Sequence, residues 1–423
     1  MGSNSKPPPS RAGGPRAYAT AAAAVWVLVF AMHGVPGAAK CEFKAIFNFG
    51  DSNSDTGGFW AAFPAEAGPF GMTYFRKPAG RAADGRLAID FLAQALGIPF
   101  LSPYLQSIGS SYKHGANYAT LASTVLLPNT SLFVTGISPF SLAIQLNQMR
   151  QFKARVLELS PIKGSILPPK DVFGRSLYTL DIGQNDFTSN LASIGIEGVK
   201  QYLPQVAGTI SWTIKELYAL GGRTFLVMNL APVGCYPALL AELPHNSSDL
   251  DEYGCMVSYN DAVADYNDML RETLRQTGGA LPGAAVVYVD THAVKLELFR
   301  HPTDHGESCA PQPPHLPLSS SDNIYDDAKT RRRKGLLYGT RACCGHGGGA
   351  HNFDPRVYCG NSKVIDGANV TAAACADPQN YVSWDGIHAT EAANKLVAWA
   401  IVNGSYSEPR FPLSNFCDLK PIG

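Results

Sequence analysis

The chain has 423 residues, 45% of them hydrophobic, and its 34 basic side chains balance its 34 acidic ones. This composition supplies ample material for a globular core, and the 41 glycines and 30 prolines indicate many loops around it. The balanced charge provides no basic surface of the kind that attracts nucleic acid or acidic membranes, so we expect neither as a partner.

The N-terminal segment has the layout of a secretory signal. Arg11 and Arg16 precede an apolar stretch from about Ala21 to Met32, and small residues continue to Ala39. This stretch is short for a bilayer span, which takes roughly 20 residues. We therefore predict a signal peptide over residues 1–39 and a secreted, extracellular protein. The alternative is a retained signal-anchor that holds the protein in the Golgi.

Strands and helices are predicted to alternate along the rest of the chain. Four apolar runs are typical of buried parallel strands: residues 43–49, 177–182, 224–230 and 285–290. Helical patterns cover residues 86–96, which Gly97 would end, and about 138–158, 207–221, 257–277 and 389–402. The alternation predicts an α/β fold, a doubly wound sandwich with a central, mainly parallel sheet flanked by helices.

The first predicted strand ends in a segment that favours catalysis. Residues 43–49 lead into Gly50, Asp51 and Ser52 and then into a polar turn. A buried strand that stops at a tight turn presents the next side chain at the carboxyl edge of the sheet, where α/β enzymes keep their sites. Ser52 is therefore a candidate nucleophile, provided that a base and oxyanion donors lie elsewhere in the chain.

A candidate base lies far downstream, in residues 383–390. Asp385 stands three residues before His388, so its carboxylate can accept the Nδ1 proton and leave Nε2 free to take a proton from serine. Two intervening segments supply candidate oxyanion donors. Asn185 follows an apolar run and offers its side-chain N–H, and Gly115 would let its backbone N–H approach a substrate closely.

The four segments that carry Ser52, Gly115, Asn185, and Asp385 with His388 resemble four sequence blocks of the GDSL, or SGNH, hydrolases, and they follow one another in the same order. The resemblance runs from about Cys41 to about Cys417, and Gly-Asp-Ser-Asn-Ser-Asp-Thr-Gly-Gly is similar to a plant extracellular subgroup. It implies the SGNH, flavodoxin-like form of the fold and ester hydrolysis without a metal or organic cofactor. It assigns the catalytic triad to Ser52, His388 and Asp385, and the oxyanion hole to Ser52, Gly115 and Asn185.

The resemblance also suggests a substrate class. The subgroup includes esterases of acetylated glycosides and cell-wall polysaccharides, and proteins that were once called fucosidases. We therefore expect a small-molecule or polysaccharide ester as substrate, with removal of acetyl groups from a carbohydrate such as xylan. Two alternatives stay open: a lipase for longer acyl esters, and a carbohydrate-binding protein without catalysis on the same fold.

Residues beside the predicted catalytic positions carry further information. Asn53 replaces the leucine of the GDSL motif, at a position without a catalytic role in the family. Ser54 stands where the elbow Gly-x-Ser-x-Gly has its second glycine, which argues against an ordinary α/β-hydrolase. Asp51 and Asp186 are expected to hold their loops through hydrogen bonds to backbone N–H groups.

Two motifs suggest other chemistry. Asp55-Thr56-Gly57 spells the triplet of aspartic proteases, but that mechanism needs two carboxylates that share a proton, and no matching second triplet follows. Two cysteines and two histidines between Cys343 and His351 could ligate zinc. Adjacent cysteines lack the spacing usual in zinc sites, however, and an oxidising route favours disulfides.

Nine cysteines fit an oxidising compartment. We expect bridges Cys235–Cys255 and Cys41–Cys417, two bridges joining Cys343 and Cys344 to Cys359 and Cys375, and an odd Cys309. Four acceptor sequences for N-glycosylation begin at Asn129, Asn246, Asn369 and Asn403.

The chain is predicted to form a single domain over residues 40–423. A site built from Ser52 and His388 draws on both ends of the chain, which outweighs a length that would otherwise suggest two or three domains. Residues 307–334 have the composition of a solvated loop and stand as an insertion relative to the family pattern.

Overall fold

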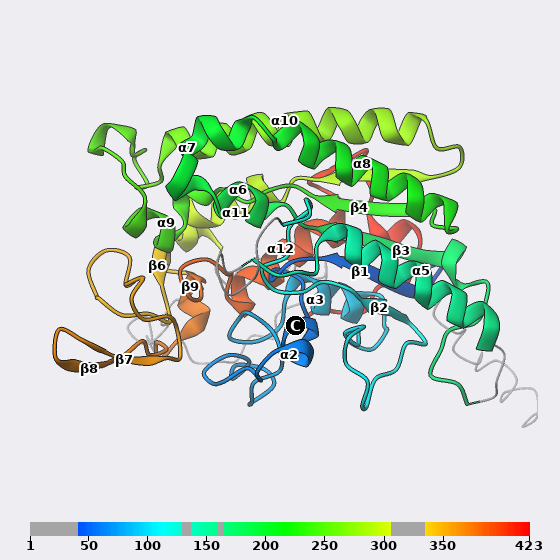
Figure 1. The fold of residues 1–423 in the computed structure, drawn as a ribbon, viewed down its shortest axis with the longest axis horizontal. Helices are drawn as coiled ribbons and strands as arrows, with labels where there is room; N and C mark the ends of the chain where they lie inside the picture. The colour runs from blue at the N-terminus through cyan, green and yellow to red at the C-terminus, as the bar shows by residue number, and fades with distance from the viewer. Residues whose placement is uncertain (1–40, 129–136, 160–163, 306–334) are drawn as a thin grey trace, which may run out of the picture. The chain divides into compact units, whose positions relative to one another are not determined.

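A six-stranded sheet organises this computed structural model, which describes residues 41–128, 137–159, 164–305 and 335–423 (Figure 1). The strand order is β10-β5-β4-β3-β1-β2. The strands are β1 (Ala45–Gly50), β2 (Gly115–Asn117), β3 (Ser176–Asp181), β4 (Thr224–Met228), β5 (Ala285–Val289) and β10 (Ser407–Glu408). All pair in parallel except β10, which is antiparallel to β5.

The four longer parallel strands lie where the apolar runs predict them, and the fold class is confirmed. Every residue of β1 is buried, as a strand covered on both faces requires. The short strands β2 and β10 were not predicted, because two or three residues leave no apolar run. The order β2-β1-β3-β4-β5 is the flavodoxin-like one, whose direction reverses between β1 and β3. A ligand site is therefore expected beyond the carboxyl ends of β1 and β3.

Helices cover the sheet in two layers (Figure 1). One layer contains α5 (Leu142–Leu159), α8 (Leu203–Ala219) and α10 (Val257–Gly279); the other contains α3 (Ala88–Ala95), α11 (Thr291–Arg300) and α12 (Glu391–Asn403). The five predicted helices are confirmed with shifts of a few residues at their ends, and Gly97 ends α3 with a φ of 69°.

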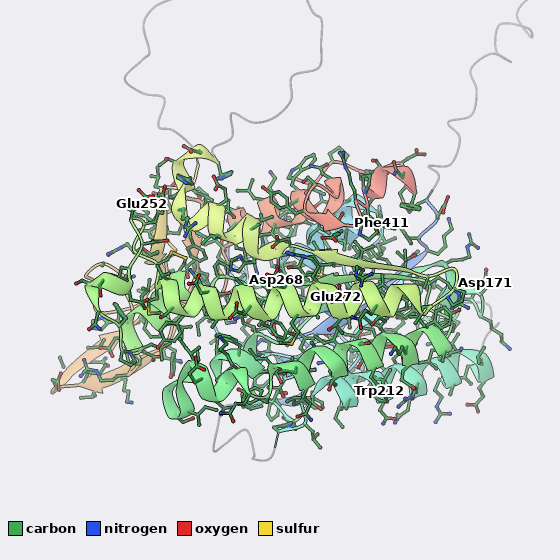
Figure 2. All side chains as sticks on the ribbon, turned by 90° about the horizontal axis from the view of Figure 1, so that it is seen from above. Asp171, Trp212, Glu252, Asp268, Glu272 and Phe411 are labelled. Atoms are coloured by element: carbon green, nitrogen blue, oxygen red, sulfur yellow. A yellow bond between two sulfur atoms is a disulfide. The ribbon has the colours of Figure 1, made fainter. Side chains whose placement is uncertain are left out.

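The long helix α10 shows why these segments form surface helices. Its residues Tyr259, Val263, Tyr266 and Leu270 are buried at spacings of three and four, which place them on one face. Asp268 and Glu272 lie on the opposite, solvent-facing side (Figure 2).

Smaller elements connect the layers and build the surroundings of the site. They are α2 (Gly58–Ala62), α6 (Gln184–Thr188), α7 (Leu191–Lys200), α9 (Pro237–Glu242), the parallel pair β6 (Tyr338–Ala342) and β9 (Tyr381–Ser383), and the antiparallel hairpin β7 (Ser362–Ile365) and β8 (Ala368–Thr371). Strand β9 ends two residues before Asp385, so the segment that carries Asp385 and His388 follows this strand.

Four disulfides confirm the expected cysteine pairing. They are Cys41–Cys417, Cys235–Cys255, Cys343–Cys375 and Cys344–Cys359. The first joins the two ends of the described chain across 376 residues. Asn246, Asn369 and Asn403 are exposed, as glycosylation requires. Cys309, Asn129, the predicted signal segment and the predicted insertion lie outside the described residues. Among the residues described, no helix combines the length and hydrophobicity needed to cross a membrane.

Candidate active site

Ser52, His388 and Asp385 meet beyond the carboxyl end of β1. Ser52 stands two residues after this strand and is 7% exposed. Its Oγ lies 2.8 Å from Nε2 of His388, and Nδ1 of the same imidazole lies 2.7 Å from Oδ2 of Asp385. The structure thus brings the three predicted residues together as a continuous hydrogen-bonded chain.

The Asp385–His388 turn is held by its own backbone. Oδ1 of Asp385 accepts the backbone N–H of Ile387 at 3.0 Å and that of His388 at 2.8 Å. The turn passes through Gly386, whose φ of 101° few other residues adopt. Because one carboxyl oxygen fixes the turn, the other is aimed at the imidazole of His388.

The two side chains shift one another's proton affinity. Burial raises the pKa of Asp385, but the positive charge and hydrogen bonds of His388 outweigh burial and bring the pKa below its usual 3.8. Burial lowers the pKa of His388, but the Asp385 carboxylate outweighs it and brings the pKa above 6.5. An ionised Asp385 therefore favours the proton on Nδ1, which leaves the lone pair of Nε2 facing the hydroxyl of Ser52.

Asn185 lies at the same edge of the sheet. It belongs to α6, which begins directly after β3 and Gly183. Its Nδ2 donates to the carbonyl of Ser123 at 2.9 Å and, over 3.4 Å, to Oδ2 of Asp51. These bonds fix the amide beside the turn that carries Ser52.

Gly115 lies elsewhere, and the structure contradicts its predicted oxyanion role. It pairs with Ile46 near the start of β1, and its N–H donates to the carbonyl of Tyr112 at 3.1 Å. Four further residues of β1 separate it from the site, about 13 Å at the rise of a strand. A Cβ at this position would lie 1.8 Å from the carbonyl oxygen of Ile46, so the glycine serves close strand packing.

The turn after β2, residues 120–123, reaches the site instead. Thr120 donates its N–H to the carbonyl of Gly50 at 3.3 Å, and Ser123 accepts from Asn185. Between them Ala122 has a φ of 63°, a left-handed conformation that costs a non-glycine residue about 1–2 kcal/mol. Such strain is concentrated at functional sites.

Two backbone N–H groups are available at this edge. Within the described residues, neither Ser52 nor Ala122 has a protein acceptor for its N–H. Ala122 was missed in the sequence because an alanine does not mark a left-handed turn. The segment Ala119–Thr124, which has five small residues and one leucine and lies shortly after β2, is the pattern that could have pointed to it.

Three other aspartates support the site. Asp51 accepts the backbone N–H of Asn53 at 3.0 Å, and Asp186 accepts the N–H groups of Val125 and Leu126, as expected for loop-holding carboxylates. Asp55 accepts four backbone N–H groups, which gives the protease-like triplet a structural role. Burial, followed by the charge of Asp181, raises the pKa of Asp51 to about 7.

The predicted alternative of a zinc site is not supported by the donor atoms. Cys343 and Cys344 are both in disulfides and are therefore not thiolate ligands. Over the ranges that the structure describes, no group of three or more histidine, cysteine, aspartate or glutamate side chains is placed to hold a metal ion.

The fold and the hydrogen-bonded chain at its switch point define a hydrolase of the α/β class, and comparison with known proteins gives its family. The model of the GDSL-like lipase/acylhydrolase family matches residues 46–401. A GDSL esterase/lipase of Arabidopsis thaliana is 60% identical over 394 residues, which cover 92% of this chain and 96% of the relative. An esterase of Hevea brasiliensis is 39% identical over 382 residues, covering 89% and 90%.

The chain therefore belongs to the GDSL esterase/lipase family and is a carboxylic ester hydrolase. Among solved structures, an acetylxylan esterase from Geobacillus stearothermophilus matches 61% of this chain and 80% of its own at 16% identity. Its TM-score is 0.28, too low to add to what the strand order shows.

Proposed function

We propose that this protein hydrolyses esters through an acyl-enzyme formed on Ser52. The observation that carries the proposal is the chain from Ser52 Oγ through His388 to Asp385, with distances of 2.8 and 2.7 Å. His388 accepts the proton of Ser52 as the serine oxygen attacks the ester carbonyl. It then protonates the leaving alkoxide and finally activates the water that releases the acid.

The developing oxyanion is held by three donors in this mechanism. They are the backbone N–H of Ser52, the backbone N–H of Ala122 and Nδ2 of Asn185. The support is that both N–H groups lack protein acceptors within the described chain and that Asn185 is bonded to the same turn. A single donor of this kind typically contributes about 2.7–4 kcal/mol to the transition state.

Acetylated carbohydrate is the proposed substrate, and the extracellular space the proposed location. The motif around Ser52 supports the substrate through its similarity to the plant extracellular subgroup. Four disulfides, three exposed acceptor asparagines and the N-terminal signal layout support secretion.

The deciding experiment is chain-length selectivity on aryl esters, from acetate to palmitate, with the secreted protein. Ser52→Ala is assayed beside it, and the exposed Ser193→Ala on α7 is the matched control. Fast acetate turnover that is lost only in Ser52→Ala supports the proposal. A preference for long chains would favour the lipase, and no turnover of any ester by folded protein would favour a non-catalytic binding protein.

A further inference from the structure

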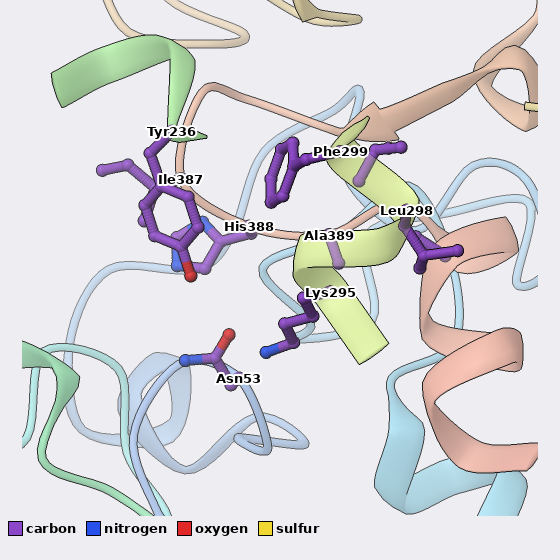
Figure 3. A pocket seen from close by; sticks show the side chains of 10 residues that line it. Asn53, Tyr236, Lys295, Leu298, Phe299, Ile387, His388 and Ala389 are labelled. Carbon is purple, nitrogen blue, oxygen red and sulfur yellow. The ribbon is translucent and has the colours of Figure 1, made fainter. Parts of the chain in front are cut away.

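A narrow recess opens directly beside His388 (Figure 3). Its lining comes from distant segments of the chain: Asn53, Tyr236, Lys295, Leu298, Phe299, Val382, Ile387, His388, Ala389 and Ala393. The recess has a volume of about 10 Å³. That space accommodates about one small group, such as a hydroxyl.

Three polar groups from separate segments converge in this apolar lining. The hydroxyl of Tyr236 and the amide oxygen of Asn53 point toward one another, and the ammonium of Lys295 lies beside them (Figure 3). Tyr236 is only 3% exposed. A few convergent polar groups in an apolar lining can fix the orientation of the group that they bind.

These polar groups retain unused hydrogen-bonding capacity. In the described part of the chain, the Tyr236 hydroxyl and the Lys295 ammonium have no hydrogen-bond or ion-pair partner. Nδ2 of Asn53 donates to Asp51, and Oδ1 of Asn53 has no hydrogen-bond donor among the described residues. Burial, followed by nearby carboxylates, raises the pKa of Tyr236 above 10, so its hydroxyl stays a donor at all working pH values.

The donor and acceptor pattern selects the kind of group that fits. A hydroxyl can accept from Lys295 or Tyr236 and donate to Oδ1 of Asn53, which satisfies both sides. A carboxylate would be repelled by the Asn53 oxygen. It would also be repelled by the negative charges of Asp51, Asp181 and Asp385, which lie close enough to raise the pKa of Tyr236. A methyl group would leave the polar groups unpaired.

The location of the recess tells which part of the substrate carries this hydroxyl. His388 lines the recess and, in the proposed mechanism, protonates the leaving alkoxide. The recess therefore lies next to the alcohol part of the ester.

We propose that Asn53, Tyr236 and Lys295 form an alcohol-side subsite. It binds a free hydroxyl on the carbon adjacent to the one that carries the ester oxygen. Carbohydrates with an unesterified neighbouring hydroxyl provide this arrangement. The inference rests on the proposed ester hydrolysis.

The test uses two substrates that differ by this one hydroxyl: the monoacetate of trans-1,2-cyclohexanediol and cyclohexyl acetate. The measured quantity is the ratio of their kcat/KM values, at a pH where His388 is neutral. We expect wild type to favour the diol ester by at least about tenfold, because a site built to bind a hydroxyl rejects the analogue that lacks it. In Tyr236→Phe, Lys295→Met and Asn53→Leu the ratio should fall toward one, whereas the exposed Lys215→Met should keep it.

Because the measured quantity is a ratio, a loss of activity that affects both esters equally cancels. Tyr236→Phe deletes only one oxygen atom, so it remains a usable test if another variant does not fold. Equal hydrolysis of the two esters by wild type, or a tenfold preference that survives in folded Tyr236→Phe, would overturn the subsite alone. A folded wild type that hydrolyses neither these esters nor phenyl acetate would overturn the ester mechanism and the subsite with it.

Discussion

Two residues with positive φ, one at the start of β2 and one in the turn that follows it, have opposite meanings. Gly115 begins the strand with a φ of 102°, and Ala122 follows its end with a φ of 63°. Gly115 has its N–H bonded to Tyr112 and no room for a Cβ. Ala122 has a Cβ, and its N–H has no protein acceptor among the described residues.

The difference shows that a glycine marks close packing as readily as it marks a functional turn. At Gly115 the backbone requirement is steric, because the strand lies against Ile46. At Ala122 the strain of a non-glycine residue is maintained next to the proposed oxyanion. Chemistry is therefore expected to depend on the carboxyl edge of the sheet, and stability on the amino edge.

The largest expected effect at the carboxyl edge is that of Asp385→Asn. The amide would no longer hold the Nδ1–H tautomer of His388, so we expect kcat to fall by about 10⁴ with little change in unfolding temperature. Steady-state kinetics on phenyl acetate measure this loss, with the exposed Asp377→Asn as control. Retention of more than a tenth of the activity would remove Asp385 from the triad.

The next effect is that of Asn185→Ala on the oxyanion side. Loss of one donor is expected to lower kcat by about 10²–10³ while KM changes little, because the donor acts on the transition state. Asn190→Ala, on a neighbouring exposed segment, is the matched control. A loss confined to KM would show that Asn185 binds substrate without stabilising the oxyanion.

A paired exchange at Gly115 and Ala122 tests the comparison directly. Gly115→Ala is expected to lower the free energy of unfolding by roughly 2–5 kcal/mol, from left-handed strain and overpacking against Ile46. Ala122→Gly should raise it by about 1 kcal/mol, because the turn is already left-handed, and should keep the N–H donor. Thermal unfolding and kcat of the folded fraction are measured together. A Gly115→Ala protein that is stable but inactive would restore Gly115 to the site.

The same pair explains how far the sequence could predict this molecule. The long strands were found because each is a continuous apolar run, and the Ser52 and Asn185 segments because polar residues follow such runs directly. The Asp385 segment was found from the spacing of an aspartate three residues before a histidine. Ala122 was not predicted, since its segment follows a three-residue strand and its left-handed φ lies in a turn that is held by tertiary hydrogen bonds of Thr120 and Ser123. The position of Lys295 beside the site was not predicted either, because α11 brings this residue there from a distant part of the chain.

The smallest effect is on the pH dependence of kcat/KM. Catalysis needs neutral His388, so activity should fall as the pH drops through its pKa, which lies above 6.5. The Asp51 charge raises this pKa and the Lys295 charge lowers it. Asp51→Asn should therefore move the acid limb to lower pH and Lys295→Met should move it to higher pH.

Each displacement is expected to be less than about one pH unit, in part because Asp51, with a pKa of about 7, is itself only partly ionised on that limb. The distant exposed variants Asp268→Asn and Lys215→Met control for net charge and should leave the limb in place. Displacements in the same direction, or none at all, would contradict the assignment of the limb to His388, because removing a nearby negative charge lowers a pKa and removing a nearby positive charge raises it.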